Sequence, residues 1–370
     1  MVLPNICTSG CSVQKSCGLF RSNFPSLSHV AIFFIRRRGV LLAGTFKQTI
    51  VVRSSLDCLS RTLTFIMFTV ACGVGLPLNG FIMKFYCCRG RKQASSSLKV
   101  FLKNLTAADF LFCLCLPLRI TYYARSSGII PSLYCSFGAS AFFLNMYASI
   151  IFMGYIAANR YLKIVNPSGT RVLQTVRTAH IISAVTWVFL LATAISYSNL
   201  YLMTQESLTS NSSRCDPLFS ESVKLFFKII QVLSAIIFLL VFISLVFFYY
   251  STSRRLASSG SEKLVKSRRN MLVLVSIFCV CFVPYHLVRL PFVFLSNSCS
   301  VGRVLYYLKE AAAMVSVFNV CLDPVVYFYL CKTFRAQVRK ASRRTNIQQA
   351  NEESESSREQ LDITTSTPVM

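Results

Sequence analysis

The sequence predicts an all-α integral membrane protein, a bundle of seven transmembrane helices followed by a short amphipathic cytoplasmic helix. Three observations support this fold class. Hydrophobic residues make up 54% of the 370 residues and charged residues 14%, whereas soluble domains carry roughly 25% charged residues. Seven stretches reach the ~20 mostly apolar residues that a membrane-spanning helix needs. The 39 Lys and Arg residues outnumber the 13 Asp and Glu residues, and most of them fall in alternate loops.

The seven predicted spans form one bundle over residues 62–330. They cover residues 62–86, 99–123, 134–162, 179–202, 223–250, 270–295 and 303–330. Because the number of spans is odd, the two chain termini must lie on opposite sides of the membrane.

Basic residues in the loops give the orientation, because cytoplasmic loops of membrane proteins are enriched in Lys and Arg. The loops after spans 1, 3 and 5 and the segment after span 7 are basic, and the opposite loops are poorer in Lys and Arg. The loop after span 5, between Arg254 and Arg269, carries six of these residues. We therefore predict a multi-pass protein of the plasma membrane with an extracellular N-terminus and a cytoplasmic C-terminus.

The segments outside the bundle differ in character. Residues 1–61 are predicted to be a flexible extracellular tail. Residues 331–341 fit an amphipathic helix, with Phe334 and Val338 on one face and basic residues on the other, and such a helix lies along the anionic lipid of the inner leaflet. Residues 342–370 are polar and rich in Ser and Thr, which predicts a disordered cytoplasmic tail with phosphorylation sites.

One extracellular loop contains a candidate glycosylation site. The sequon Asn211-Ser212-Ser213 lies in the loop before span 5. Asn-x-Ser is the acceptor pattern for N-linked glycans on exposed loops, so we predict that Asn211 is modified.

Several polar and ionisable residues lie inside the predicted spans. A charged side chain at the centre of a bilayer costs roughly 2.5–3.5 kcal/mol on insertion scales, so each one needs a function or a partner. The set comprises Asn79, Asp109, Ser149, Asn319 and Asp323. One interpretation is a sodium or proton site coupled to conformational change, and the other is a structural hydrogen-bond network without a bound ion. The residues alone leave both interpretations open.

Proline residues interrupt the same spans. A proline inside a helix removes one backbone hydrogen bond and kinks the helix. In span 6 the aromatic side chains of Phe278 and Phe282 precede Pro284. This arrangement suits a hinge and is also common as static packing in membrane bundles.

Other classes of protein fit the sequence less well. A transporter would show an internal repeat or paired broken helices, and the chain has no internal repeat. The three His residues are far apart, and the sequence has no Gly-rich phosphate loop or nucleophile motif, so we expect neither an enzyme nor a metal site. The basic residues of the cytoplasmic segments and of the extracellular half of the bundle do not imply nucleic acid, so we expect no nucleic-acid partner; those of the N-terminal tail have no physical explanation.

The polar and proline motifs together carry a family resemblance. They are Asn79 in span 1, Leu105-Thr106-Ala107-Ala108-Asp109 in span 2, Asn159-Arg160-Tyr161 ending span 3, Trp187 in span 4, Phe282-x-Pro284 in span 6 and Asn319-x-x-x-Asp323-Pro324-x-x-Tyr327 in span 7. With these motifs the chain resembles a rhodopsin-like (class A) G-protein-coupled receptor over residues 60–341.

The resemblance implies partners and a set of coupling residues. Arg160 would contact a heterotrimeric G protein when span 6 swings outward. Asn159 replaces the family's usual Asp, so the ion pair that restrains Arg160 is missing; either basal activity is raised or other contacts hold the inactive state. The resemblance also implies a receptor kinase and arrestin at the tail and a disulfide between Cys135 and Cys215. The residues assigned to activation and coupling are Arg160, Tyr249, Phe278, Phe282, Pro284 and Tyr327.

The extracellular half of the predicted bundle combines basic and aromatic side chains. His286 and Arg289 stand three residues apart on span 6 and therefore share one face of the helix. Arg and Lys suit phosphate oxygens, and aromatic faces suit a purine or pyrimidine ring. The alternative is that these basic residues snorkel toward lipid headgroups, which explains Arg289 poorly. The candidate ligand-binding residues are Arg119, Phe143, Tyr147, His286, Arg289, Tyr306 and Lys309.

A narrower resemblance indicates the class of ligand. Residues 281–292, 305–310 and 319–324 resemble the purinergic nucleotide-receptor cluster, in which the His and Arg of span 6 and the Lys of span 7 contact the phosphates. This implies an extracellular nucleotide or nucleotide sugar, an inhibitory G protein and a second disulfide between Cys58 and Cys299.

Two other ligand assignments stay open. Leu116-Pro117-Leu118 and Tyr122-Tyr123 are similar to the platelet-activating-factor receptor, so a phospholipid mediator, either platelet-activating factor or a lysophospholipid, is the alternative. A weakly signalling or scavenging receptor is a further alternative, given Asn159.

Overall fold

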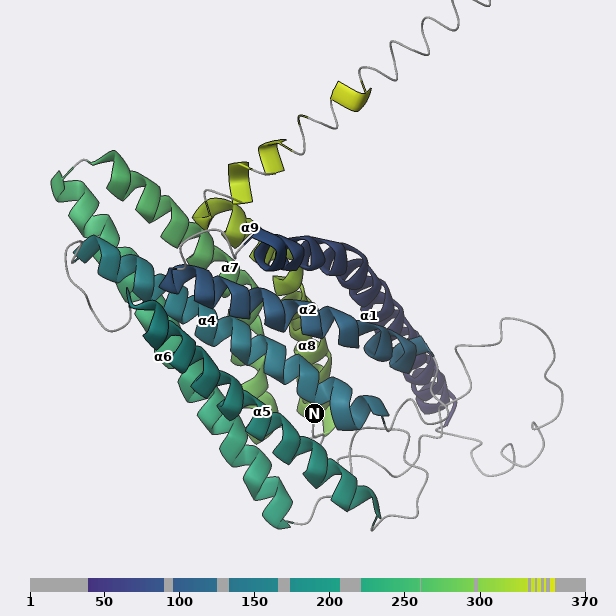
Figure 1. The fold of residues 1–370 in the computed structure, drawn as a ribbon. Helices are drawn as coiled ribbons and strands as arrows, with labels where there is room; N and C mark the ends of the chain where they lie inside the picture. Colours follow the sequence, from purple (N-terminus) through teal and green to yellow (C-terminus); the bar gives the residue numbers. More distant parts are fainter. Residues whose placement is uncertain are drawn as a thin grey trace, which may run out of the picture.

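The computed structural model of the chain describes residues 39–89, 96–124, 133–165, 174–206, 221–259, 261–295 and 299–331, with the short pieces 334–336, 338–340, 343 and 347–349 beyond them. Side chains are described for most of these residues from residue 60 onward. Within these ranges all regular secondary structure is helical (Figure 1). The elements are α1 (Gly39–Arg89), α2 (Ser97–Ala124), the π-helical turn η2 (Tyr134–Gly138), α4 (Ala139–Val165), α5 (Val176–Glu206), α6 (Glu221–Ser259), α7 (Glu262–Leu295), α8 (Cys299–Val317) and α9 (Asn319–Leu330).

The structure confirms the seven-span bundle. The described chain holds seven helical segments long and apolar enough to cross a membrane: Thr62–Tyr86, Ser97–Tyr122, Ser136–Val165, Val176–Asn199, Lys228–Ala257, Leu264–Phe294 and Val304–Leu330. Span 3 combines η2 with α4, and span 7 combines α8 with α9. Each segment overlaps one of the predicted spans, because hydropathy over ~20 residues is set by local composition alone.

The first helix differs from the prediction. α1 begins at Gly39 and runs for 51 residues, whereas span 1 was predicted to begin at residue 62. The prediction of a flexible tail over residues 1–61 is therefore wrong for residues 39–61, whose backbone is helical. Neither glycine nor proline occurs between Gly44 and Gly73, so nothing in that stretch interrupts helical geometry.

The predicted third cytoplasmic loop is also mostly helix. α6 ends at Ser259 and α7 begins at Glu262, so residues 254–259 and 262–269 of this segment are helical (upper left of Figure 1). The carbonyl of Ser261 accepts the backbone N–H groups of the first turn of α7, as a helix start requires. The six basic residues of this segment lie near the ends of these two helices, two on α6 and four on α7.

Span 7 is interrupted at Phe318, between α8 and α9. Further along, Pro324 has no N–H, which leaves the carbonyl of Val320 without its helical partner. Asn79 of α1 supplies the missing donor, since its Nδ2 lies 2.7 Å from that carbonyl oxygen. Gly75 allows α1 to approach this closely, because a Cβ there would lie 2.8 Å from Cγ2 of Val320.

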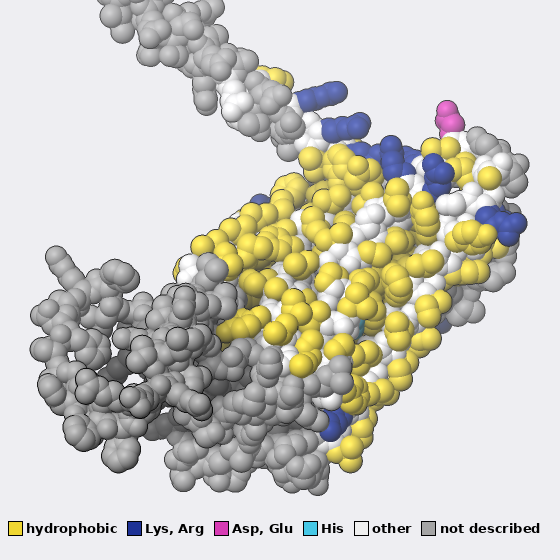
Figure 2. Space-filling model, turned by 180° about the vertical axis from the view of Figure 1, so that it is seen from behind, with side chains coloured by type: hydrophobic (Ala, Val, Ile, Leu, Met, Phe, Trp, Pro, Cys, Tyr) yellow, Lys and Arg dark blue, Asp and Glu magenta, His cyan; other side chains and the backbone are white. Residues whose placement is uncertain are grey.

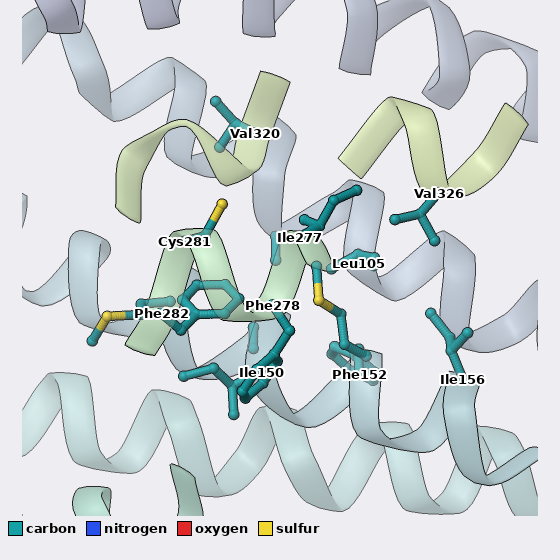
Figure 3. Close-up of a cluster of buried hydrophobic side chains, with 14 of the residues drawn as sticks. Leu105, Ile150, Phe152, Ile156, Ile277, Phe278, Cys281, Phe282, Val320 and Val326 are labelled. Atoms are coloured by element: carbon teal, nitrogen blue, oxygen red, sulfur yellow. The ribbon is translucent and has the colours of Figure 1, made fainter. Parts of the chain in front are cut away.

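α4 lies in the middle of the bundle and contacts α2, α5, α6 and α7. Figure 3 shows part of this core, where Phe278 and Phe282 of α7 point toward Ile150 of α4 and Cys281 points toward Val320 of α9. The flank of the bundle is apolar, and Lys and Arg side chains gather at the end where the C-terminal segment leaves (Figure 2). We call this the basic end, and the opposite end the far end.

Candidate ligand-binding site

Arg289 lies inside the bundle near the far end of α7. Its side chain is buried, at 7% exposed, and its guanidinium stands over the ring of Phe143, 4.6 Å from the centroid. Its Nε donates to Oε1 of Gln231 on α6, and a terminal nitrogen donates to the hydroxyl of Tyr285 one helical turn earlier. Both hydrogen-bond partners are neutral, so hydrogen bonds hold this cation without a carboxylate.

His286 shares this face of α7 and joins three helices. Its Nδ1 lies 2.8 Å from the carbonyl of Phe282; a carbonyl only accepts, so Nδ1 carries the hydrogen. In the neutral ring Nε2 is then an acceptor, and the hydroxyl of Tyr147 on α4 lies 3.2 Å from it. The ring stacks on Phe238 of α6 with centroids 3.9 Å apart and an interplanar angle of 4°. These contacts fix both the position and the tautomer of the imidazole.

Lys309 supplies a second cation from α8. It is 1% exposed, and its Nζ lies 3.1 Å from Oε1 of Glu310. The same Nζ stands 4.8 Å from the ring centroids of both Phe292 and Tyr306. Phe292 belongs to α7, three residues after Arg289, so the two cations line neighbouring faces of α7 and α8.

Arg119 supplies a third cation on the α2 side of the bundle. It is 2% exposed, and its guanidinium lies 4.2 Å from the ring centroid of Phe68 and 4.9 Å from that of Phe142. Phe142 in turn contacts Tyr285 edge to face, with centroids 5.8 Å apart. This pair of rings therefore connects the Arg119 cluster with the Arg289 cluster.

Among the described residues, buried cationic side chains outnumber buried carboxylates inside the far end of the bundle. Arg119, Arg289 and Lys309 are all buried, and the buried carboxylate described at this end is Glu310. Charges removed from water need opposite charges or hydrogen bonds to offset the loss of hydration. The arrangement can accept an anionic group such as a phosphate by charge-assisted hydrogen bonds, and its aromatic faces can stack on a flat ring.

The structure brings the seven predicted ligand-binding residues to the far end and adds four that sequence reasoning missed. The additions are Gln231, Tyr285, Phe142 and Phe238. Gln231 carried a usable signal, because it is an isolated amide in the apolar run of α6. The three aromatic residues carried no such signal in the sequence, since Phe and Tyr are common throughout the spans.

The polar residues inside the spans form a network around α4. Nδ2 of Asn145 lies 3.0 Å from Oδ1 of Asp109, and Nδ2 of Asn319 lies 3.0 Å from Oγ of Ser149. Both oxygens of Asp323 lack a hydrogen-bond partner among the described residues, as does Oδ2 of Asp109. Asn145 was missed as a member of this network. Asn79, which was predicted to belong to it, donates instead to backbone carbonyls of α1 and α9.

At the basic end the predicted coupling residues contact neighbouring helices. A terminal nitrogen of Arg160 donates to the carbonyl of Leu330 at 2.7 Å, and Asn159 donates to Oγ of Ser97 at 2.7 Å. Tyr327 is buried, and its hydroxyl donates to the carbonyl of Leu102. The side chains of Tyr249, Phe278 and Phe282 pack in or against the apolar core, and Pro284 lies inside α7.

Some predicted residues lie outside the described side chains. They are the four cysteines of the two predicted disulfides, Cys58, Cys135, Cys215 and Cys299, and the glycosylation candidate Asn211. Both modifications stay predictions. The tail over residues 342–370 is described at isolated positions only, so its predicted disorder also stays a prediction.

Comparison with known proteins identifies the fold family. A family model described as "7 transmembrane receptor (rhodopsin family)" matches residues 78–327. The chain belongs to this receptor family. Similar proteins include purinoceptor 14 of Bos taurus, 32% identical over 290 residues that cover 74% of this chain and 82% of the relative. G-protein coupled receptor 87 of Mus musculus is 31% identical over 293 residues (75% and 79%), and purinoceptor 13 of Rattus norvegicus is 28% identical over 311 residues (81% and 90%).

Membership of the family has direct consequences for this receptor. Its members are receptors and not enzymes, which confirms the prediction that the chain is not an enzyme. The family implies an extracellular ligand and a G protein as partners, and a multi-pass location in the plasma membrane. The purinoceptors among its relatives confirm the predicted resemblance to the purinergic cluster.

Proposed function

We propose that this receptor binds a small phosphate-bearing extracellular ligand, most simply a nucleotide or a nucleotide sugar. The observation that carries the proposal is Arg289, a buried cation whose hydrogen-bond partners, Gln231 and Tyr285, are neutral. Burying a cation without an opposite charge beside it costs several kcal/mol of lost hydration. An anionic ligand offsets this cost when it binds. The rings of Phe143 and Tyr306 lie beside the cations, where they can stack on a base.

The proposed orientation places this site outside the cell. The Lys and Arg side chains at the basic end (Figure 2) support a cytoplasmic location for that end and an extracellular N-terminus. The far end, with Arg289 and Lys309, then opens toward the extracellular fluid. The basic end would meet the G protein, which we propose to be of the inhibitory class, and phosphorylation of the tail would recruit arrestin after a receptor kinase has acted.

The test is an activation screen of nucleotides, nucleotide sugars and lysophospholipids in parallel, read out with a panel of Gα subunits. We expect Arg289→Ala to abolish the response to a phosphate-bearing agonist while surface expression persists, because charge-assisted hydrogen bonds to phosphate contribute about 1.5–3 kcal/mol each. The matched control is Lys228→Ala, which removes an exposed cation near the same end of α6. The matched ligand control is the nucleoside without its phosphates, which should be inactive.

Two outcomes would overturn the proposal. Full agonist potency in Arg289→Ala would show that the buried cation does not contact the ligand. Activation by lysophospholipids alone would assign the site to a lipid phosphate and reject the nucleotide. The parallel screen distinguishes these outcomes because both ligand classes are tested on the same variants.

We also propose that the polar network holds a sodium ion. The two fully buried carboxylates, Asp109 and Asp323, have oxygen atoms without hydrogen-bond partners among the described residues, and oxygen ligands of this kind suit a hard cation. We expect sodium to raise the thermal midpoint of the ligand-free receptor and Asp109→Asn to remove that dependence. Equal midpoints in sodium and in choline chloride would reject the ion site and leave a plain hydrogen-bond network.

A further inference from the structure

The C-terminal end of α9 is capped by arginine side chains. α9 ends at Leu330 because Cys331 leaves the helix with φ −106° and ψ 103°. The last four carbonyls of a helix have no N–H partner within it, and they carry the negative end of the helix dipole, about half an elementary charge. Arg160 donates to one of them, the carbonyl of Leu330. The helix end therefore offers Arg160 a negative partner made of backbone alone.

A second arginine occupies two more of these carbonyls. Nε of Arg335 donates to the carbonyl of Phe328 at 3.1 Å, and a terminal nitrogen donates to the carbonyl of Tyr329 at 3.0 Å. The remaining carbonyl, that of Tyr327, accepts the backbone N–H of Cys331 at 2.8 Å. Arg335 thus saturates the carbonyls next to Leu330 and leaves that of Leu330 for Arg160.

Arg160 has few alternatives to this partner. Residue 159, where the family usually has Asp, is Asn, and its amide is bonded to Ser97 on α2. Between Asp109 and Glu352, the acidic residue on the predicted cytoplasmic side is Glu262, which is exposed in the first turn of α7. Among the described residues Arg160 forms no ion pair. The end of α9 takes the place of the missing carboxylate.

The same turn of α9 also contacts span 6. The guanidinium of Arg269, near the basic end of α7, stands 5.7 Å from the ring centroid of Tyr329. Tyr327, two residues earlier, is anchored to α2 through the carbonyl of Leu102. One helical turn, residues 327–330, therefore touches spans 2, 3 and 6 together.

We propose that this turn is a clasp that holds Arg160 and α7 in the low-activity arrangement of the receptor. When the basic end of α7 moves away from α9, the contact between Arg269 and Tyr329 breaks; when Arg160 turns toward a G protein, it leaves the carbonyl of Leu330. Arg335 is a positioning residue, because it steadies the end of α9 and directs its last carbonyl to Arg160. The proposal rests on membership of the receptor family and not on the class of ligand.

The primary experiment measures ligand-free nucleotide exchange on a panel of purified Gα subunits, with the receptor in lipid nanodiscs. We expect Arg269→Gln and Tyr329→Leu each to raise basal exchange about two- to fivefold, which corresponds to the ~0.5–1 kcal/mol of an exposed cation–π contact. The double variant should match the single variants, since each removes the same contact. Tyr329→Phe keeps the ring and should leave basal exchange unchanged.

Matched controls separate the clasp from a general effect of charge. Arg268→Gln removes the same charge from the next residue of α7, which is exposed, and should have no effect. Arg335→Ala should raise basal exchange and Arg335→Lys should restore part of the restraint, whereas Arg339→Ala, an exposed arginine on the same segment, should be neutral. A purely structural role for Arg335 would not be rescued in this way.

Hydrogen–deuterium exchange in the same nanodiscs decides the question if no Gα subunit responds without ligand. We expect faster exchange at the end of α9 in Arg335→Ala and at the basic end of α7 in Arg269→Gln. Three outcomes would overturn the clasp. Arg268→Gln could raise basal nucleotide exchange as much as Arg269→Gln, or the effects of the two single variants could multiply in the double variant. The third is that hydrogen–deuterium exchange of the backbone amides stays unchanged in the variants. Because no ligand is added, these results are independent of the test of the nucleotide site.

Discussion

Asn79 and Pro324 should be energetically coupled although they belong to the first and the last span. Pro324 frees the carbonyl of Val320, and Asn79 donates to it at 2.7 Å. Asn79→Leu keeps the branched shape of the side chain but removes the donor, so the carbonyl is left buried and unpaired. Leaving a buried acceptor unsatisfied costs about 1–3 kcal/mol, and we expect Asn79→Leu to destabilise the receptor by that amount.

The same substitution should be less harmful when residue 324 has its own N–H. In a Pro324→Ala background the helix supplies the donor to Val320, so the side chain of Asn79 is no longer required there. We expect the cost of Asn79→Leu to fall by about 1–2 kcal/mol, a coupling within the range found for residues in one hydrogen-bond network.

Thermal unfolding of the purified, ligand-free receptor measures this cycle. One kcal/mol shifts the midpoint by about 2–4 °C for chains of 150–250 residues, so Asn79→Leu should lower it by about 2–12 °C in the parent receptor and by less than half as much with Pro324→Ala. An equal drop in both backgrounds would refute the reasoning, because Asn79 would then act through something other than the freed carbonyl.

Two further predictions follow from close packing and buried hydroxyls. Gly75→Ala should destabilise the receptor by about 1–3 kcal/mol, because the new Cβ would lie 2.8 Å from Cγ2 of Val320. Gly73→Ala is the control: a Cβ there has nothing within 4 Å, so it should be neutral or slightly stabilising. Equal unfolding midpoints for the two variants would contradict the close approach of α1 and α9. Tyr327→Phe should cost about 0.5–1.5 kcal/mol, since it removes one hydrogen bond to the buried carbonyl of Leu102, which still accepts the hydroxyl of Thr106. An unchanged unfolding midpoint would show that the Tyr327 hydrogen bond contributes nothing.

Much of the fold was predictable from the sequence, and the exceptions have physical causes. Hydropathy located all seven spans, because a bilayer requires long apolar segments whatever their neighbours are. Hydropathy failed at the ends of helices: α1 begins at Gly39, and residues 254–259 and 262–269, predicted as a loop, belong to α6 and α7. Polar residues can continue a helix into water, so hydropathy marks the membrane boundary and not the helix boundary.

The candidate site was predictable as a set of residue types and not as a set of contacts. His286 and Arg289 could be placed on one face from their spacing, and both line the far end. The partner of Arg289, Gln231, comes from α6, 58 residues away in the sequence. No local pattern connects these two residues, because the rotation of each helix about its axis is set by packing against its neighbours.

By itself the sequence determined the number of spans, the receptor family and which ionisable groups must be buried in a membrane. Only the tertiary structure decided which partner each group takes. Arg160 lacks the expected acid beside it and meets the carbonyl of Leu330, 170 residues away, while Asn79 meets that of Val320, 241 residues away. The physical reason is that membrane insertion depends on local composition, whereas a hydrogen bond depends on the register and facing of helices that meet only in the folded bundle.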